Sequence, residues 1–312
     1  MLRALILAVT MLLAAIPAAA QDKRIALSFD DVPRAAGAFL TPDQRTVRLI
    51  AALHRAGVRQ AVFFVNPGNI EKSDGGADRI DAYVAAGHVI ADHSWSHPHL
   101  SAMTAEAYLA DIDRAEAWLK GREGYRPWFR YPFLDEGQDD KAKRDAVRAG
   151  LAARGLANGY VTAESSDWFL EQLTREAVAD GKPIDMDALR DLYVESHVEA
   201  AEFYYALARR TLGRSPAQVM LLHETDIAAL FIDDLVAALR ARGWTIVTAD
   251  QAYADPIAVE ATRYDTPSAQ GTLTEMLAWQ AGLPAPRWYA RNNINLARRL
   301  FDERVLHQAA AQ

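Results

Sequence analysis

Short apolar runs alternate with segments of helical periodicity along most of the chain. A run of four to eight apolar residues is typical of a buried strand, whereas apolar residues three and four positions apart indicate one face of a helix. On this basis we expect seven strands, at residues 24–29, 60–65, 88–92, 127–131, 158–163, 218–223 and 244–249. Helices are expected between them, at residues 43–57, 77–87, 104–121, 139–155 and 231–243. This alternation predicts a parallel sheet, either open or closed into a barrel.

Two further helical stretches depart from this alternation. Residues 171–212 predict at least two helices, divided near Gly181–Pro183. Beyond residue 255 the strand pattern stops, and two helices are expected at 272–281 and 292–306. We interpret residues 256–312 as a helical appendage that packs on the rest of the protein through four aromatic residues: Trp279, Trp288, Tyr289 and Phe301.

The first 20 residues have the pattern of a secretory signal peptide. Arg3 precedes an apolar run from Ala4 to Ile16, and the small residues Ala18-Ala19-Ala20 are typical of a cleavage site before Gln21. A membrane anchor is the alternative, but the run is shorter than the roughly 20 residues that span a bilayer. We therefore predict an exported protein, periplasmic or secreted, with no stable membrane span after cleavage and a main domain at residues 21–255.

Charge and cysteine content exclude several kinds of site. The net charge of −7 argues against a nucleic acid or an anionic membrane as the main partner. The chain contains no cysteine, so a thiolate nucleophile and a cysteine-ligated zinc site are both excluded.

Candidate metal ligands lie at the predicted ends of two strands. Asp30 and Asp31 follow the first strand, where two adjacent carboxylates are costly unless a cation or a metal pairs with them; a helix cap or a turn is the alternative. His93 and His97 follow the third strand, and a spacing of four on one helical turn would direct both imidazoles at one ion. His99 is assigned to structure. Two histidines and one of the two carboxylates would form a catalytic zinc arrangement with an open position.

Three other strand ends also carry polar side chains. Arg130 lies inside an apolar strand end, where a guanidinium can orient a carboxylate. Glu164, Asp167 and Trp168 follow the fifth strand, and the indole could belong to the core or could wall a sugar-binding groove. His223 follows four apolar residues at the end of the sixth strand, as a candidate acid or base.

Five stretches in this order resemble the motifs of the polysaccharide deacetylases of carbohydrate esterase family four. They are Ser28-Phe29-Asp30-Asp31, His93-Ser94-Trp95-Ser96-His97, Arg130-Tyr131-Pro132-Phe133, Glu164-Ser165-Ser166-Asp167-Trp168 and Leu221-Leu222-His223. The resemblance covers roughly residues 24–255. It implies a distorted (β/α) barrel, and the seven strands of that fold agree with the number expected from the pattern.

The resemblance also implies a role for each matching residue. Asp30 would be the general base, oriented by Arg130, and the ligands of a divalent metal, zinc or another ion such as cobalt, would be Asp31, His93 and His97. His223 would be the general acid, and the backbone amide of Phe133 would stabilise the oxyanion. Two carboxylates would tune the acid, Glu164 and Asp167. The side chains expected to contact the substrate are Trp168 and Tyr131.

Two departures from the family pattern lead to further expectations. The fourth motif begins with Glu164 where the family has aspartate, so either Glu164 or Asp167 could tune the acid. The helical stretch 171–212 lengthens the gap before His223, and we expect an insertion that caps one end of the groove. His197, within this insertion, is expected to be structural.

The predicted function is metal-dependent removal of N-acetyl groups from amino-sugar glycans, of chitooligosaccharide or peptidoglycan type, with release of acetate. The same site could instead remove O-acetyl groups from a polysaccharide such as xylan. A non-catalytic glycan-binding module on the same scaffold is a third possibility. That third reading usually requires the loss of the base or of a ligand, and none is lost in this sequence.

Overall fold

A computed structural model describes residues 23–308 of the chain. The predicted signal peptide at residues 1–20 therefore lies outside the described residues. None of the helices within residues 23–308 is both long enough and apolar enough to cross a membrane.

The seven expected strands form one parallel sheet, so the predicted fold class is confirmed. In sequence order they are β1 (Arg24–Val32), β2 (Val62–Val65), β3 (Val89–Asp92), β4 (Tyr125–Phe129), β6 (Ala157–Asn158), β7 (Gln218–His223) and β8 (Thr245–Ile246). Their spatial order is β6-β4-β3-β2-β1-β7, and β8 pairs with the start of β1. Strand residues alternate between two apolar clusters, with Leu27 and Phe63 in one and Ala26 and Phe64 in the other. Both faces of the sheet are thus buried, as is usual for parallel sheets.

The fifth and seventh strands shorten most relative to the prediction, to two residues each. The fifth strand is regular only at Ala157–Asn158, which pairs with β4, and Ala163 then forms an isolated bridge to Met220 of β7. This segment therefore joins β4 at one end of the order above to β7 at the other end, which curls the sheet into a distorted barrel. The seventh strand, expected at 244–249, is limited to Thr245–Ile246, because Thr248 caps a short helix instead.

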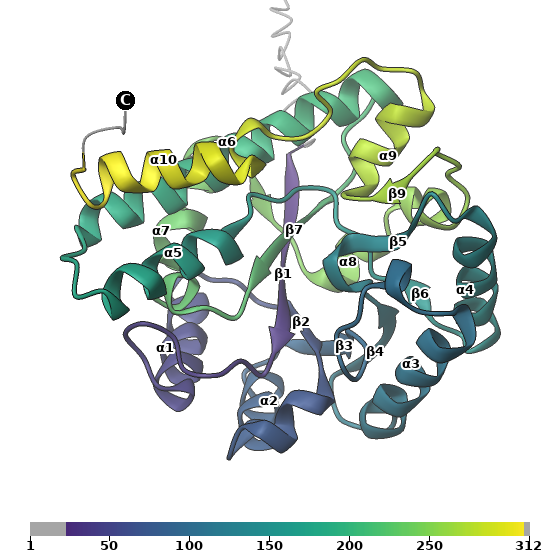
Figure 1. Cartoon of the computed structure of the whole chain (residues 1–312), viewed down its shortest axis with the longest axis horizontal. Coiled ribbons are helices and arrows are strands. Elements are labelled where there is room, and N and C mark those ends of the chain that lie inside the picture. The colour runs from purple at the N-terminus through teal and green to yellow at the C-terminus, as the bar shows by residue number, and fades with distance from the viewer. Residues whose placement is uncertain (1–22, 309–312) are drawn as a thin grey trace, which may run out of the picture.

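Helices surround the sheet, as Figure 1 shows. The expected helices between strands are α1 (Pro42–Arg55), α2 (Gly76–Ala85), α3 (Ala105–Leu119), α4 (Lys141–Ala153) and α7 (Asp226–Ala241). Shorter helical segments are η2 (Pro67–Lys72), η3 (Leu100–Ala102), η4 (Pro132–Leu134), α8 (Ala249–Tyr253), η5 (Pro256–Thr262) and η6 (Ala290–Asn292). Threonine side chains begin α1 and α3: the hydroxyl groups of Thr41 and Thr104 accept hydrogen bonds from the N–H groups three residues later.

The predicted insertion consists of two helices, α5 (Asp167–Ala179) and α6 (Met186–Leu212), which are divided near Gly181–Pro183 as expected. The C-terminal helices α9 (Leu273–Gln280) and α10 (Ile294–Arg304) pack against this insertion, and α10 runs beside α6 in Figure 1. Two of the four aromatic residues expected to pack are buried, Tyr289 and Phe301, whereas Trp288 is 48% exposed. The expected packing role was therefore wrong for Trp288.

A second, two-stranded sheet was not predicted. β5 (Asp135–Gln138) pairs antiparallel with β9 (Ala269–Gln270). This pairing brings part of the C-terminal segment beside the loop that follows β4, and therefore close to the ends of the main strands.

Candidate active site and metal centre

The predicted site residues gather at the carboxyl ends of the parallel strands. Asp30 and Asp31 lie near the end of β1, and Asp30 is in register with His223, the last residue of β7. His93 directly follows β3, which ends at Asp92. Because the carboxyl ends of all parallel strands meet at one edge of the barrel, these residues share the floor of one cleft of about 630 Å³.

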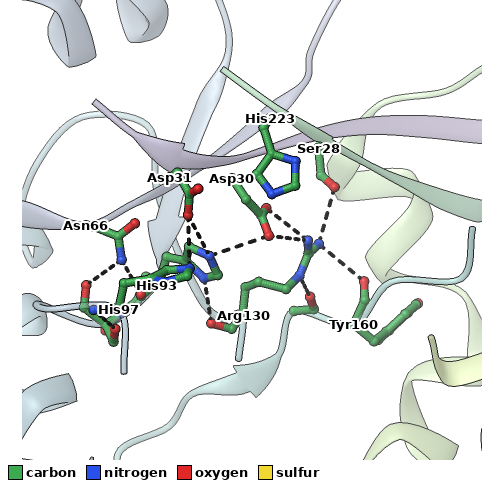
Figure 2. Close-up of polar contacts among 12 residues, drawn as sticks. Ser28, Asp30, Asp31, Asn66, His93, His97, Arg130, Tyr160 and His223 are labelled. Carbon is green, nitrogen blue, oxygen red and sulfur yellow. Dashed lines mark hydrogen bonds and ion pairs between the residues drawn. The ribbon is translucent and has the colours of Figure 1, made fainter. Parts of the chain in front are cut away.

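Asp31, His93 and His97 form a compact group (Figure 2). Asp31 Oδ1 lies 3.0 Å from His97 Nε2 and 3.5 Å from His93 Nε2, and one donor atom of each residue lies within 4.8 Å of the others. The Nδ1 atom of His93 is 2.8 Å from the carbonyl oxygen of Arg130. If Nδ1–H donates to this carbonyl, the lone pair of Nε2 is directed at Asp31.

The sequence interpretation assumed that one helical turn brings the two histidines together, and this assumption was wrong. The segment after β3 is an irregular loop, in which Ser94 and His97 have φ values of 67° and 57°. Asp31 is also in the left-handed region, at φ 67°. Non-glycine residues rarely adopt this conformation, and strained positions of this kind cluster at functional sites.

The loop of His93 is fixed by two polar residues that were not singled out from the sequence. Asn66 Nδ2 donates to the carbonyl oxygens of His93 and Ser94, at 2.5 and 3.1 Å, and Asp92 Oδ1 accepts from the Ser94 N–H at 2.6 Å. Asn66 directly follows β2 and Asp92 ends β3. Strand-end position was therefore the signal that could have identified both.

Asp30 is held by a buried ion pair. Arg130 Nη1 lies 2.9 and 3.0 Å from the two carboxylate oxygens of Asp30, and both residues are at most 3% exposed. The other guanidinium nitrogens of Arg130 also donate hydrogen bonds: Nε donates to Gly159 O, and Nη2 donates to Tyr253 OH at 3.0 Å. Asp30 Oδ2 also lies 3.5 Å from His93 Nε2, so this carboxylate borders the candidate metal centre. Tyr253 was not identified from the sequence, because it is brought here only by tertiary packing.

His223 is held by Asp167 at the start of α5. Asp167 Oδ1 is 2.7 Å from His223 Nδ1, and Asp167 Oδ2 accepts from the backbone N–H of His223 at 2.8 Å. Burial alone would lower the pKa of His223, but the charge and hydrogen bond of Asp167 outweigh it and raise the pKa above its ordinary value. Burial by itself would raise the pKa of Asp167. The charge and hydrogen bonds of His223 more than offset this effect, so the pKa of the Asp167 carboxyl is lowered.

The structure distinguishes between the two carboxylates expected to tune the acid. Asp167 bonds to His223 directly, whereas the hydrogen bonds of Glu164 go to the Ser166 N–H at 3.3 Å and to Asn292 Nδ2 at 2.7 Å. Burial raises the pKa of Glu164 to about 7. Glu164 still lines the cleft, but its direct partners lie in its own loop and in the C-terminal segment.

The remaining predicted residues occupy different surroundings. Phe133 lines the cleft at φ 57°, with its ring stacked on His99 at 3.6 Å and edge-on to His97 at 4.5 Å. Trp168 is 39% exposed and also lines the cleft. Tyr131 is 3% exposed and packs with Tyr108 and Phe129 in a core cluster, so its side chain does not line the cleft and we do not retain it as a substrate contact.

The two histidines assigned to structure both have internal partners. His99 Nδ1 is 3.1 Å from Asp135 Oδ2. His197 is buried within α6, and its Nδ1 atom is 2.7 Å from the carbonyl oxygen of Tyr193.

Segments outside the sheet complete the cleft. Helix α5 contributes Glu171, Gln172 and Arg175, so the insertion forms one wall, and β9 contributes Gln270 and Gly271. Gln270 Nε2 donates to the carbonyl oxygen of Phe133 at 3.2 Å. The C-terminal segment, which we interpreted as an appendage, is therefore also part of the cleft.

Comparison with known proteins gives consistent matches. Residues 18–153 match the polysaccharide deacetylase family. A peptidoglycan-N-acetylglucosamine deacetylase of Listeria monocytogenes is 22% identical over 255 residues, covering 80% of this chain and 43% of that protein. A peptidoglycan-N-acetylglucosamine deacetylase of Bacillus cereus is 31% identical over 119 residues, covering 38% of this chain and 39% of that protein. The chain thus matches less than half the length of either relative.

A solved structure also shares the fold. The chitin deacetylase of the fungal pathogen Colletotrichum lindemuthianum superposes with a TM-score of 0.51 at 20% identity. The superposition covers 75% of this chain and 88% of that one.

Proposed function

Because the chain belongs to the polysaccharide deacetylases of carbohydrate esterase family four, we propose that it removes N-acetyl groups from amino-sugar glycans and releases acetate. The observation that carries this proposal is the convergence, in one cleft, of three potential metal ligands with an arginine-held carboxylate and an aspartate-held histidine. The proposed substrates are of chitooligosaccharide or peptidoglycan type. The predicted signal peptide and the peptidoglycan-related names of the relatives support export to the periplasm or the medium.

We further propose that Asp31, His93 and His97 hold a divalent cation, zinc or a similar ion such as cobalt. Two imidazoles and one carboxylate are a donor set that suits zinc and leaves a coordination position open for the substrate or water. The contact of His93 Nδ1 with a backbone carbonyl is the outer interaction that usually orients a ligating histidine. When bound, such a cation lowers the pKa of a water molecule and polarises the acetamide carbonyl.

Asp30 is the proposed general base. Its carboxylate borders the candidate metal centre, and Arg130 fixes its orientation through one nitrogen that faces both carboxylate oxygens. A base held in this way can take a proton from the attacking water without a prior change of side-chain conformation. Arg130 is itself fixed by Gly159 and Tyr253, so the orientation of the base depends on the barrel wall behind it.

His223 is the proposed general acid. An amine is a poor leaving group unless it is protonated as the C–N bond breaks, and the imidazole lines the cleft from β7. The raised pKa of His223 keeps the proton on the imidazole at a higher pH than an isolated histidine would allow. We assign the stabilisation of the oxyanion to the backbone N–H of Phe133, and contact with the sugar to Trp168.

Acetate release tests the proposal. Purified protein with zinc or cobalt is incubated with acetylated chitooligosaccharides, with peptidoglycan and with acetylated xylan, and free acetate is measured. We expect acetate from the first or the second substrate, and Asp30→Asn should retain the metal but lose turnover. The matched control is Asp139→Asn, at an exposed position in the loop before α4. If the metal-loaded protein releases no acetate from any of the three, the proposal is wrong, and release from xylan alone would indicate an O-deacetylase instead.

A further inference from the structure

One face of helix α5 lines the cleft beyond the proposed reacting groups. Trp168, Gln172 and Arg175 all border the cleft, at positions separated by four and then three residues. This spacing places their side chains on one side of the helix. The face begins immediately after Asp167, which holds His223.

Arg175 brings an uncompensated positive charge to this face. Its side chain is exposed, and within residues 23–308 it has no hydrogen-bonded or ion-paired partner. The other arginine at the cleft surface, Arg34, is paired with Asp31 at 2.5 Å. Of the two arginines that line the cleft, Arg175 therefore remains available to a ligand.

The two glutamates of α5 near Arg175 form interactions with other residues. Glu176 accepts from Gln172 Nε2 at 2.8 Å and pairs with Arg298 of α10 at 3.3 Å. Glu171 is buried, and its carboxylate accepts from the Ile227 N–H at 3.2 Å. Neither carboxylate neutralises the guanidinium of Arg175.

The position of Arg175 fits a sugar next to the one that reacts. Arg175 lies seven positions after Trp168 along the helix, a rise of roughly 10 Å along the helix axis. A glycan chain whose acetylated sugar lies against Trp168 and His223 would bring a neighbouring sugar towards Arg175. A guanidinium prefers planar anions, because two of its N–H groups match the two oxygens of a carboxylate.

We propose that Arg175 binds the carboxylate of a sugar adjacent to the N-acetylated sugar, so that acidic amino-sugar glycans are preferred over neutral ones. This inference rests on the proposed function and narrows its substrate class. The overall charge of −7 would repel an acidic glycan, and the unpaired guanidinium of Arg175 offsets that repulsion at the cleft.

Matched substrates test this preference. N-acetylglucosamine oligosaccharides are prepared with a carboxylate on the neighbouring sugar, as a uronic acid in one series and as a lactyl ether in a second, each with its neutral methyl ester. We expect wild-type kcat/KM to be about fivefold to tenfold higher for the carboxylate form than for the ester in at least one series. The series that shows this preference indicates whether the bound group is a uronic acid or a lactyl ether. Arg175→Gln should bring the ratio close to one, and Arg175→Lys should retain part of it. The control is Arg299→Gln, an exposed arginine of α10 that does not line the cleft, which should leave the ratio unchanged.

Binding separates failure of this inference from failure of the proposed function. Calorimetric titration of the metal-loaded Asp30→Asn protein, with and without Arg175→Gln, measures the same preference without turnover. If the carboxylate form binds in a way that depends on Arg175, but the wild-type protein releases no acetate from any glycan, the inference is supported and the proposed function is contradicted. Turnover with equal efficiency on both forms, or a preference that survives Arg175→Gln, would overturn the inference and leave the proposed function intact.

Discussion

Replacement of Asp167 by asparagine is expected to move the basic limb of the pH–rate profile to lower pH. The general acid must carry a proton, so kcat/KM falls as the pH rises through the pKa of His223. Asp167 raises this pKa, whereas burial acts in the opposite direction. Without the charge of Asp167, burial is opposed only by the smaller effect of Asp31, so His223 loses its proton at a lower pH than in the wild type.

The size of this shift follows from the contact geometry. Asp167 bonds to the imidazole at 2.7 Å and to the backbone N–H of the same residue at 2.8 Å. Asparagine can still hydrogen-bond but carries no charge. A hydrogen bond to a charged group contributes about 1.5–3 kcal/mol, and one pKa unit corresponds to about 1.4 kcal/mol. The basic limb should therefore move down by about one to two pH units.

The assay is acetate release from an acetylated chitooligosaccharide, with kcat/KM measured from about pH 5 to about pH 10. On the alkaline side, Asp167→Asn should lose about tenfold to 100-fold relative to the wild type, and the loss should shrink as the pH falls. The matched control Asp139→Asn should reproduce the wild-type profile. A loss of the same size at every pH would refute the reasoning, because it would indicate misplacement of His223 and not a change in its pKa.

Three further substitutions test other parts of the account. His97→Ala should weaken zinc binding by more than about 100-fold, measured by competition with a chromogenic chelator; unchanged affinity would exclude His97 as a ligand. Arg130→Lys keeps the charge but cannot reproduce the contacts to Asp30, Gly159 and Tyr253, so urea unfolding should show a loss of about 2 kcal/mol together with reduced kcat. Burial raises the pKa of Glu275 from 4.5 to about 8, so the folded protein binds more protons than the unfolded chain in this range, and stability falls as the pH rises through it. Urea titrations at about pH 5 and pH 9 measure this loss of stability, and Glu275→Gln should reduce it by about 5 kcal/mol at most. The part that remains comes from other buried carboxyls such as Glu164, and an unchanged loss would contradict the assignment.

The strand ends could be predicted because each buried strand shows up as a local apolar run, and helices between the runs indicate parallel pairing. Apolar runs locate the strands, and a parallel sheet brings their carboxyl ends to one edge. Asp31, His93 and His97 converge for this reason, and the assumption of a helical turn between the two histidines was unnecessary. Alternation along the strand expected at 127–131 could also have predicted that Tyr131 points to the side opposite its neighbour Arg130.

Contacts between distant segments could not be predicted in this way. Glu164 meets Asn292 although 128 residues separate them, and no periodic pattern connects the two positions. The pairing of β5 with β9 is likewise set by the packing of the C-terminal segment, and its strands of four and two residues are too short to show a strand pattern. These contacts place the C-terminal segment at the cleft, where Gln270 and Gly271 line it, whereas the position of the insertion beside the groove was expected from the sequence.

Acetate release before and after removal of the metal tests the central claim most directly. The protein is treated with a chelator, dialysed, and assayed on an acetylated chitooligosaccharide and on peptidoglycan, then assayed again after one equivalent of zinc is restored. We predict that activity is lost with the metal and returns with it, and that zinc fails to restore activity to His97→Ala. Acetate release that continues at the wild-type rate in the metal-free protein would contradict the assignment of Asp31, His93 and His97 as the metal centre of a deacetylase.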